Sequence, residues 1–283
     1  MQYMMSEYLT VAQKQRLTEL SAPEEEIGAV FSDSGERDLF FKEKEKYHTG
    51  QNRRRISEML EKNHRPLLLD VEEALSGWLY EQGFTRVVTP TIITSDMLSK
   101  MSIDPVHPLT NQVFWLDEKH CLRPMHAPNL YEVMGRLRKI TRKQVRIFEC
   151  GSCFRKESQG SRHLNEFTML NLVELAGIEI GGQMQRLTEL VCGAMNALAI
   201  TDYELVTEKS KVYGETLDVL VNGNELASCA YGPHPLDDNW NISDPWVGVG
   251  LGLERIAMIK AGHRNIKRAG RSLGYLDGVR LNL

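Results

Sequence analysis

The sequence predicts an α+β fold, in which helices flank a mainly antiparallel sheet and a small helical extension precedes it. Strand-like segments follow one another with turn residues between them, and the helical segments are set apart from the strands. The glycine-rich residues 248–252 lack the regular βα alternation of a dinucleotide-binding fold, so they are not a dinucleotide fingerprint. We place the N-terminal extension at residues 1–62 and the main domain at residues 63–283.

The extension has the pattern of two or three polar helices. Thr10 can cap the first helix, which carries Leu17 and Leu20. Residues 23–35 have the composition of a loop. The alternating lysines and glutamates of residues 42–46 predict the solvated face of a later helix.

The main domain begins with a helix that Pro66 can open at its first turn and that Gly83 ends. Its apolar residues recur at helical spacing, namely Leu67, Leu68, Val71, Leu75, Trp78 and Leu79. One face of this helix should therefore be buried. Residues 84–93 then predict a strand that Pro90 interrupts. Because proline removes a backbone hydrogen-bond donor, this strand should lie at an edge or an interface.

Strands dominate the rest of the chain. They are expected over residues 113–116, 145–149, 167–173, 203–207, 215–221 and 225–231. A helix is expected over residues 183–199, because its apolar residues recur at helical spacing.

Composition and charge exclude several classes of protein. The sequence holds no run of 18 apolar residues, so we expect no membrane span, and residues 1–7 lack the pattern of a secretory signal, so we expect a cytoplasmic protein. The net charge is −4, which argues against a uniformly basic nucleic-acid coat. Basic residues nevertheless gather at Arg53–Arg55 and between residues 260 and 271. Such clusters are either solvated surface or contacts to a phosphate backbone.

Two arginine-containing motifs stand in a fixed order. The first is Phe-Arg-Lys-Glu at residues 154–157, and the second is the glycine-rich run 248–255, which ends in Glu-Arg. Arg155 and Glu157 should share one face of a strand, because residues two apart point the same way. A guanidinium can bind a phosphate through two parallel hydrogen bonds, whereas an exposed Arg–Glu pair is the alternative interpretation.

Together these motifs resemble motifs 2 and 3 of the class II aminoacyl-tRNA synthetases, and residues 66–93 resemble motif 1. The resemblance implies the class II catalytic fold and the use of ATP. It also implies a homodimer, because motif 1 forms the dimer interface in that family.

A second set of residues predicts a pocket. Phe167, Met169, Asn171 and Val173 share one face of their strand, and residues 127–134 contribute one helical face. The residues on that helical face are Ala127, Leu130, Tyr131 and Met134. An apolar surface with a single amide suits a large neutral substrate with one hydrogen-bonding group, although an ordinary core would show the same pattern.

Five segments resemble the pyrrolysyl-tRNA synthetase family. They are residues 122–125 (Leu-Arg-Pro-Met), 127–131 (Ala-Pro-Asn-Leu-Tyr), 155–158 (Arg-Lys-Glu-Ser), 166–171 (Glu-Phe-Thr-Met-Leu-Asn) and Arg271-Ser272 with Tyr275. The resemblance covers nearly the whole chain and matches the catalytic portion of the family. It implies activation of pyrrolysine and its transfer to an amber-decoding tRNA. The length fits a free-standing catalytic subunit, with a separate tRNA-binding subunit, or a form that lacks the extra tRNA-binding domain.

The resemblance also implies roles for single residues. ATP binding is implied for Arg155, Glu157, His163, Phe167, Glu225, Ser228, Gly250 and Arg255, of which Arg155, Arg255 and Glu225 are the expected catalytic residues. Arg155 should bind the α-phosphate, while Phe167 and Arg255 should enclose the adenine. Glu225 and Ser228 should hold Mg²⁺ together with the triphosphate, which requires a bulge because residues three apart on an ideal strand point in opposite directions.

Asn171 should bind the amide carbonyl of the substrate. The implied tunnel for the substrate side chain is lined by Ala127, Leu130, Tyr131, Met134, Met169, Val173 and Trp246, and Tyr213 should act as a lid. His126 departs from the family, which usually has leucine at this position. The residues 1–62 and 260–271 are the candidates for tRNA contact.

Three alternatives remain at this point. The chain could be a class II synthetase for another large neutral amino acid, such as a phenylalanine-like one. It could be a paralogue that binds amino acid or tRNA without catalysis. It could also be a structural or nucleic-acid-binding protein in which the motifs are incidental.

Overall fold

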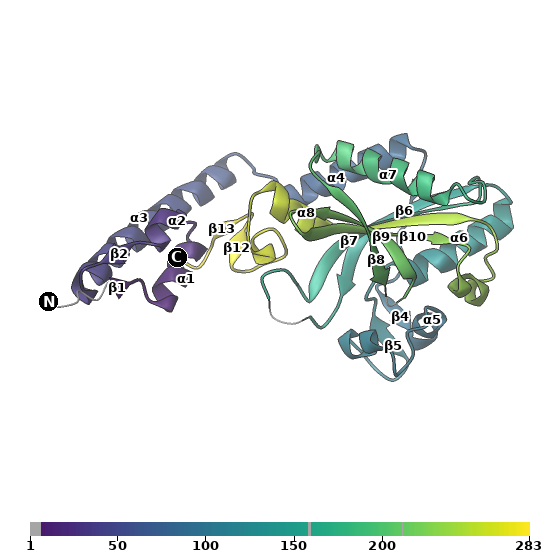
Figure 1. The fold of residues 1–283 in the computed structure, drawn as a ribbon, viewed down its shortest axis with the longest axis horizontal. Coiled ribbons are helices and arrows are strands. Elements are labelled where there is room, and N and C mark those ends of the chain that lie inside the picture. Colours follow the sequence, from purple (N-terminus) through teal and green to yellow (C-terminus); the bar gives the residue numbers. More distant parts are fainter. Residues whose placement is uncertain (1–6, 158–159, 211) are drawn as a thin grey trace. The chain divides into compact units, whose positions relative to one another are not determined.

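The computed structural model describes residues 7–157, 160–210 and 212–283 of the chain (Figure 1). Contacts between Cα atoms divide these residues into two units. The first unit contains the residues up to Pro66 together with Ser272–Leu283, and the second contains Leu67–Arg271.

Helices dominate the first unit. Its helices are α1 (Val11–Glu19), α2 (Glu24–Ile27) and α3 (Ser34–Glu61), and its short antiparallel pairs are β1 (Glu7–Tyr8) with β2 (Val30–Phe31) and β12 (Tyr275–Leu276) with β13 (Val279–Arg280). Thr10 caps α1 as predicted, because its side chain accepts a hydrogen bond from the Gln13 backbone N–H. The prediction of a loop over residues 23–35 is wrong, because α2 and β2 lie within this segment.

Asn52 joins three segments of this unit from the buried face of α3. Its Nδ2 donates to Leu20 O over 2.9 Å, and its Oδ1 accepts from Arg280 N over 3.2 Å. Arg53, Arg54 and Arg55 of α3 are exposed to solvent. Within the described residues no helix, α3 included, has both the length and the apolar character that a membrane span requires.

A seven-stranded sheet forms the centre of the second unit, in the order β3-β6-β7-β11-β10-β9-β8. Its strands are β3 (Thr85–Arg86), β6 (Val145–Phe154), β7 (Glu166–Leu175), β8 (Glu204–Ser210), β9 (Gly214–Val221), β10 (Asn224–Gly232) and β11 (Trp246–Gly252). All neighbouring strands are antiparallel except β3 and β6. The predicted α+β class with a mainly antiparallel sheet is therefore confirmed.

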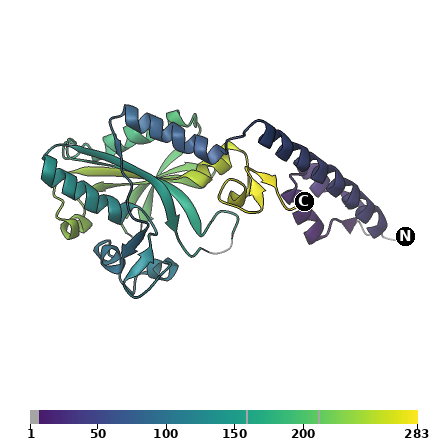
Figure 2. The ribbon, with the colours of Figure 1, turned by 180° about the vertical axis from the view of Figure 1, so that it is seen from behind.

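Helices cover both faces of this sheet (Figures 1 and 2). On one face α4 (Leu67–Glu81), α7 (Gln183–Ala197) and α8 (Leu253–Lys260) enclose a core that includes Leu75, Leu190 and Ile256. The other face carries α6 (Ala127–Thr141) and α5 (Ser95–Lys100), with a second core around Leu130 and Leu175. The short elements of this unit are β4 (Ile92–Thr94), β5 (His120–Leu122) and the 3₁₀ helices η1 (Pro108–Gln112), η2 (Pro235–Trp240) and η3 (Ile266–Arg268).

Three predicted strands differ from the structure. Residues 113–116 do not form a strand, because η1 ends beside them and only a single bridge joins Trp115 to Cys121. Residues 84–93 contain two short strands on either side of Pro90, and the first, β3, lies at the sheet edge as proline requires. Strand β6 ends at Phe154, so Arg155 and Glu157 follow the strand rather than share its face.

Candidate active site

A cavity of about 370 Å³ opens on the α6 face of the sheet. Strands β7, β10 and β11 form its floor, α6 forms one wall, and the loop between β8 and β9 contributes Tyr213. One end is rich in charged side chains and the other is apolar. Such a cavity is large enough to enclose a small molecule with two chemically different ends.

Two arginines mark the charged end. The guanidinium of Arg155 lies 5.4 Å from the centre of the Phe167 ring, and its Nε donates to Pro124 O over 2.9 Å. Burial lowers the pKa of Arg155 without removing its charge. Arg255, at the start of α8, donates from Nη1 to Glu225 O over 3.0 Å. The two cations therefore line the same end of the cavity, where an anionic ligand would neutralise them.

Glu225 and Ser228 reach this end from β10. The register between β10 and β9 shifts between Glu225 and Ala227, which is the bulge that the sequence required. Ser228 Oγ donates to Asp218 Oδ1 over 2.7 Å, so Asp218 fixes its direction. Among the described residues no group of three or more His, Cys, Asp or Glu side chains could hold a metal ion. Carboxylate and hydroxyl oxygens still suit Mg²⁺, provided that a ligand supplies further oxygens.

A buried carboxylate joins α8 to β7 behind the charged end. Glu254 accepts hydrogen bonds from the backbone N–H of Thr168 at 2.8 Å and from its hydroxyl at 2.9 Å. Arg271 Nη1 donates to Thr168 Oγ1 over 2.6 Å. Burial raises the pKa of Glu254. This network fixes α8, and with it Arg255, relative to the strand that carries Phe167.

Aromatic side chains line the apolar end. Tyr131 on α6 lies 5.5 Å from Trp246 on β11 between ring centres, and Tyr213 lies 6.2 Å from the same indole. Trp240 stacks on the outer face of Tyr131 at 5.4 Å. These rings leave an apolar space between α6 and the sheet that suits an aliphatic chain ending in a ring.

Asp237, on η2, holds two of these rings. Its Oδ1 accepts from Tyr131 Oη over 3.1 Å, and its Oδ2 accepts from Trp246 Nε1 over 2.9 Å and from His234 N over 2.7 Å. The carboxylate is only 3% exposed, and burial raises its pKa. The His234 ring, in turn, contacts Tyr213 O at 3.1 Å, which joins the β8–β9 loop to the same group.

Asn171 is the polar residue in the middle of the β7 floor. It pairs with Gly250 on β11 and with Glu149 on β6. Its Oδ1 lies 3.1 Å from Nδ1 of His126, a side chain that is completely buried at the start of α6. An amide in this position can donate to a carbonyl group in the cavity.

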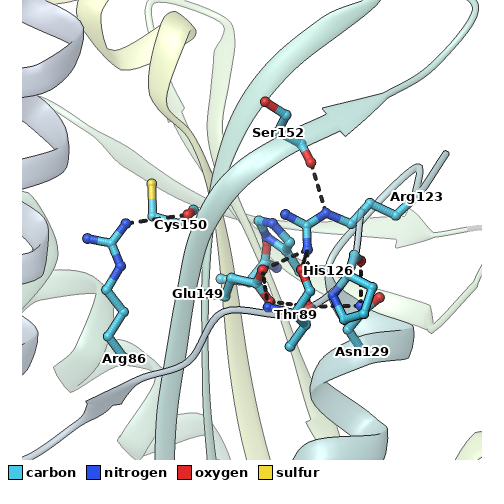
Figure 3. A network of polar contacts seen from close by, with 10 residues as sticks. Arg86, Thr89, Arg123, His126, Asn129, Glu149, Cys150 and Ser152 are labelled. Atoms are coloured by element: carbon cyan, nitrogen blue, oxygen red, sulfur yellow. Dashed lines mark hydrogen bonds and ion pairs between the residues drawn. The ribbon is translucent and has the colours of Figure 1, made fainter. Parts of the chain in front are cut away.

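A buried ion pair supports the start of α6 (Figure 3). Glu149 on β6 accepts from Arg123 Nη1 over 2.6 Å and from Thr89 Oγ1 over 2.6 Å. Asn129 on α6 donates to Thr89 Oγ1 over 2.8 Å. Arg123 also donates from Nε to Ser152 O over 2.9 Å. The group therefore ties the segment around Pro90 to β6 and to the helix that forms the cavity wall.

The structure brings every predicted site residue to this cavity. These residues are Ala127, Leu130, Tyr131, Met134, Arg155, Glu157, His163, Phe167, Met169, Asn171, Val173, Tyr213, Glu225, Ser228, Trp246, Gly250 and Arg255. The Glu157 backbone N–H donates to Asn165 Oδ1 over 3.2 Å. Ser158, the last residue of the segment 155–158 that resembles the pyrrolysyl-tRNA synthetases, lies outside the described residues.

Sequence reasoning missed the groups that hold these residues in place. Asp218, Asp237 and Glu149 are all buried carboxylates; Asp237 and Glu149 contact Tyr131 and Thr89, which lie far from them along the chain, and Asp218 contacts Ser228 on the next strand. An isolated acidic residue in a predicted strand or turn gives no sign of such a partner. The sequence does not show that these carboxylates are buried, and so it does not show that they need hydrogen-bond partners.

Comparisons with known proteins match this chain to aminoacyl-tRNA synthetases. The family model for the phenylalanyl tRNA synthetase beta chain CLM domain matches residues 57–231. A crystal structure of pyrrolysyl-tRNA synthetase from Desulfitobacterium hafniense is 51% identical, and the match covers 99% of this chain and 100% of that one with a TM-score of 0.90. A structure of PylSc, a pyrrolysyl tRNA synthetase from the same organism, is also 51% identical, covering 98% of this chain and 96% of that one with a TM-score of 0.87.

A more distant similarity is to an aspartate–tRNA(Asp/Asn) ligase from Methanocorpusculum labreanum. It is 28% identical over an alignment of 166 positions that covers 54% of this chain. The match spans only 35% of the length of that ligase.

Proposed function

The chain belongs to the family that the phenylalanyl-tRNA synthetase beta-chain model describes and, within it, to the pyrrolysyl-tRNA synthetases, and from this premise we propose that it activates pyrrolysine with ATP and transfers it to its cognate amber-decoding tRNA. One observation carries the proposal. The cavity joins an arginine-rich end to an apolar end with a single amide between them, as a nucleotide and a long neutral side chain together require.

Arg155 and Arg255 form the ATP-binding end of the proposed site. Attack of the substrate carboxylate on the α-phosphorus builds negative charge, which the guanidinium of Arg155 stabilises. Phe167 and Arg255 offer the adenine an aromatic face and a cationic face. Phe167 and Arg255 both line this end of the cavity, which supports the assignment.

Glu225 and Ser228 are the residues that would hold Mg²⁺. Both line the charged end, and the bulge after Glu225 lets them act on the same space. When bound, the ion would neutralise phosphate charge. Two protein oxygens are too few for a full coordination shell, which fits an ion that arrives with ATP.

The apolar end is the proposed pocket for the aliphatic chain and ring of pyrrolysine. Tyr131 and Trp246 form its deep wall, and Tyr213 acts as the lid. Asn171 donates a hydrogen bond to the amide carbonyl that joins lysine to the ring. A site that hydrogen-bonds this carbonyl should reject substrates without it far more strongly than a purely apolar pocket would.

The chemistry then needs no side-chain nucleophile. The substrate carboxylate attacks the α-phosphorus, and pyrophosphate leaves. The terminal hydroxyl of the tRNA next attacks the carbonyl carbon of the adenylate, and AMP leaves. The protein contributes positioning and charge stabilisation to both steps.

Three further assignments extend the proposal. The exposed apolar residues Val88 and Ile92, which are 89% and 52% exposed on either side of Pro90, support a homodimer through this segment. The exposed arginines of α3 and the basic residues 260–271 support contact with tRNA, with or without a separate tRNA-binding subunit. Translation enzymes act on cytoplasmic tRNA, so we assign the protein to the cytoplasm.

Pyrophosphate exchange tests the proposal directly. Purified protein is incubated with ATP, Mg²⁺ and labelled pyrophosphate, together with pyrrolysine, an Nε-acyl-lysine or each standard amino acid. Exchange with the first two alone is the expected result. Exchange with phenylalanine or another standard amino acid would support ATP-dependent activation of an amino acid but contradict pyrrolysine as the substrate. Absence of exchange with every substrate, in folded protein that binds ATP, would favour a non-catalytic paralogue.

A further inference from the structure

His126 and Asn171 meet at the edge of the cavity, where His126 Nδ1 lies 3.1 Å from Asn171 Oδ1. The imidazole is 0% exposed, so no water competes for this contact. A leucine, the usual residue of the family at this position, offers Asn171 no hydrogen-bond donor. The contact is therefore a feature of this chain.

The guanidinium of Arg123 lies on the other side of the imidazole. A Cβ atom at Gly151 would lie 2.7 Å from Arg123 Nη2 and 3.6 Å from His126 Nε2, so both groups occupy the space above this glycine. Arg123 cannot turn away, because it binds Glu149 Oε1 and Ser152 O. Figure 3 shows the fixed guanidinium next to the His126 ring.

This arrangement selects one protonation state. Burial and the charge of Arg123 lower the pKa of His126 to about 4, so the ring is neutral at pH 7 and carries one N–H. A proton on Nε2 would face the cation, whereas a lone pair there faces it favourably. Nε2 has no hydrogen-bond partner among the described residues, which leaves Nδ1 as the better site for the proton.

The tautomer in turn selects the direction of the Asn171 amide. An Nδ1–H donor requires Oδ1 of Asn171 as its acceptor, which directs Nδ2 away from His126. Nδ2 lies above Gly250, where a Cβ atom would be only 2.7 Å away, so the glycine leaves room for this orientation. Both Asn171 and Gly250 line the cavity.

We propose that His126, held as the Nδ1–H tautomer beside Arg123, is a positioning residue that fixes the Asn171 amide with its N–H donors toward the substrate. The inference rests on the proposed function, in which Asn171 binds the substrate carbonyl. A free amide could turn by half a rotation and present its oxygen to that carbonyl, which would repel it. His126 removes this wrong state before the substrate arrives and so raises selectivity.

A matched pair of variants tests the proposal in the full-length protein. Asparagine and leucine have nearly the same shape, but H126N keeps a nitrogen donor bonded to Cγ, as in histidine, and H126L has none. Pyrophosphate exchange is measured with an Nε-acyl-lysine and with a hydrocarbon analogue of equal length that lacks the amide. The readout is the ratio of kcat/KM for the two substrates.

In H126L the ratio should fall about tenfold through a higher KM for the acyl-lysine, the effect of one well-placed hydrogen bond. In H126N the ratio should stay within about threefold of the original protein, and KM for ATP should change in neither variant. Equal ratios in H126L and H126N would overturn the proposal, because a merely structural role would affect both alike.

Two further measurements keep the result unambiguous. Imidazole ¹⁵N NMR of the unmodified protein should show His126 neutral with its proton on Nδ1, and a proton on Nε2 would overturn the proposal without any variant. N171L should bring the ratio close to one. If N171L leaves the ratio unchanged, the proposed role of Asn171 itself fails. If N171L removes the discrimination and H126L does not, only the inference about His126 fails.

Discussion

Trp246 Nε1 donates a hydrogen bond to Asp237 Oδ2 over 2.9 Å, from the cavity wall to a carboxylate that is itself almost completely buried. The other carboxylate oxygen accepts from Tyr131 Oη over 3.1 Å. One acidic side chain on η2 therefore fixes two aromatic rings of the pocket wall, one from a helix and the other from a strand. The shape of the pocket depends on a residue that never reaches its surface.

Replacing Asp237 should therefore widen the pocket and weaken the fold. In D237L three buried donors lose their acceptor, so we expect unfolding free energy to fall by about 2–4 kcal/mol and KM for pyrrolysine to rise at least tenfold. D237N has the same shape and keeps an acceptor for Trp246, so its losses should be smaller in both measurements. Urea unfolding and pyrophosphate exchange provide the two values. Equal losses in D237N and D237L would show that charge, rather than hydrogen bonding, holds the rings.

The faces of this site were predictable because they are local patterns. The apolar residues of α6 follow helical spacing, and those of β7 alternate, so the sequence indicates which side chains share a surface. Asp237 has no such pattern, since Tyr131 precedes it by more than one hundred residues along the chain. Residues 113–116 show the opposite error, in which an apolar run predicts a strand but only a single bridge, from Trp115 to Cys121, pairs it with a neighbour. Pairing and burial are long-range properties that local spacing does not contain.

Glu225 should control the dependence of activity on Mg²⁺. Its carboxylate lines the charged end, and the E225Q variant keeps its shape while removing the charge that attracts a divalent ion. We expect the Mg²⁺ concentration for half-maximal pyrophosphate exchange to rise about tenfold or more. Glu208 on the exposed edge strand β8 provides the control, and E208Q should leave this concentration unchanged. A normal Mg²⁺ dependence in E225Q would remove Glu225 from the metal site.

The buried pair Arg123–Glu149 should be costly to break and less costly to replace. R123M or E149L alone leaves an uncompensated buried charge, so each should lower the unfolding free energy by about 3–5 kcal/mol. The double variant R123M/E149L removes both charges and should lose much less than the sum of the single losses. Chemical denaturation of the four proteins completes the cycle. Additive losses would contradict a direct interaction between the two side chains.

Arg53, Arg54 and Arg55 on α3 should contribute to tRNA affinity through charge alone. Replacement of all three by glutamate should weaken tRNA binding at least tenfold, because several contacts to phosphate groups would be lost. The slope of log affinity against log salt should fall by about three at the same time, because fewer counterions are released. K139E/K143E, at exposed lysines outside both segments that are candidates for tRNA contact, is the control for a general effect of charge. Unchanged affinity and slope in the triple variant would exclude these arginines from the tRNA interface.

His126 should make the fold sensitive to mild acid. Its pKa is lowered to about 4 by burial and by Arg123, with Glu149 opposing this shift, whereas the unfolded chain protonates an ordinary histidine near pH 6.5. Below pH 6.5 the unfolded state therefore binds a proton that the folded state does not, so stability falls as pH falls. The loss from this group should reach about 2 kcal/mol between pH 7.5 and pH 5.

The H126N variant isolates this contribution, because asparagine does not titrate and has a similar ability to donate to Asn171. Urea unfolding at pH 7.5 and pH 5 should show a difference between the two pH values that is smaller in H126N by about 2 kcal/mol. The remaining pH dependence belongs to groups that both proteins share. If the two proteins lose stability equally on acidification, His126 either protonates freely in the folded state or already carries its proton at neutral pH. Both results would contradict a buried imidazole that Arg123 keeps neutral.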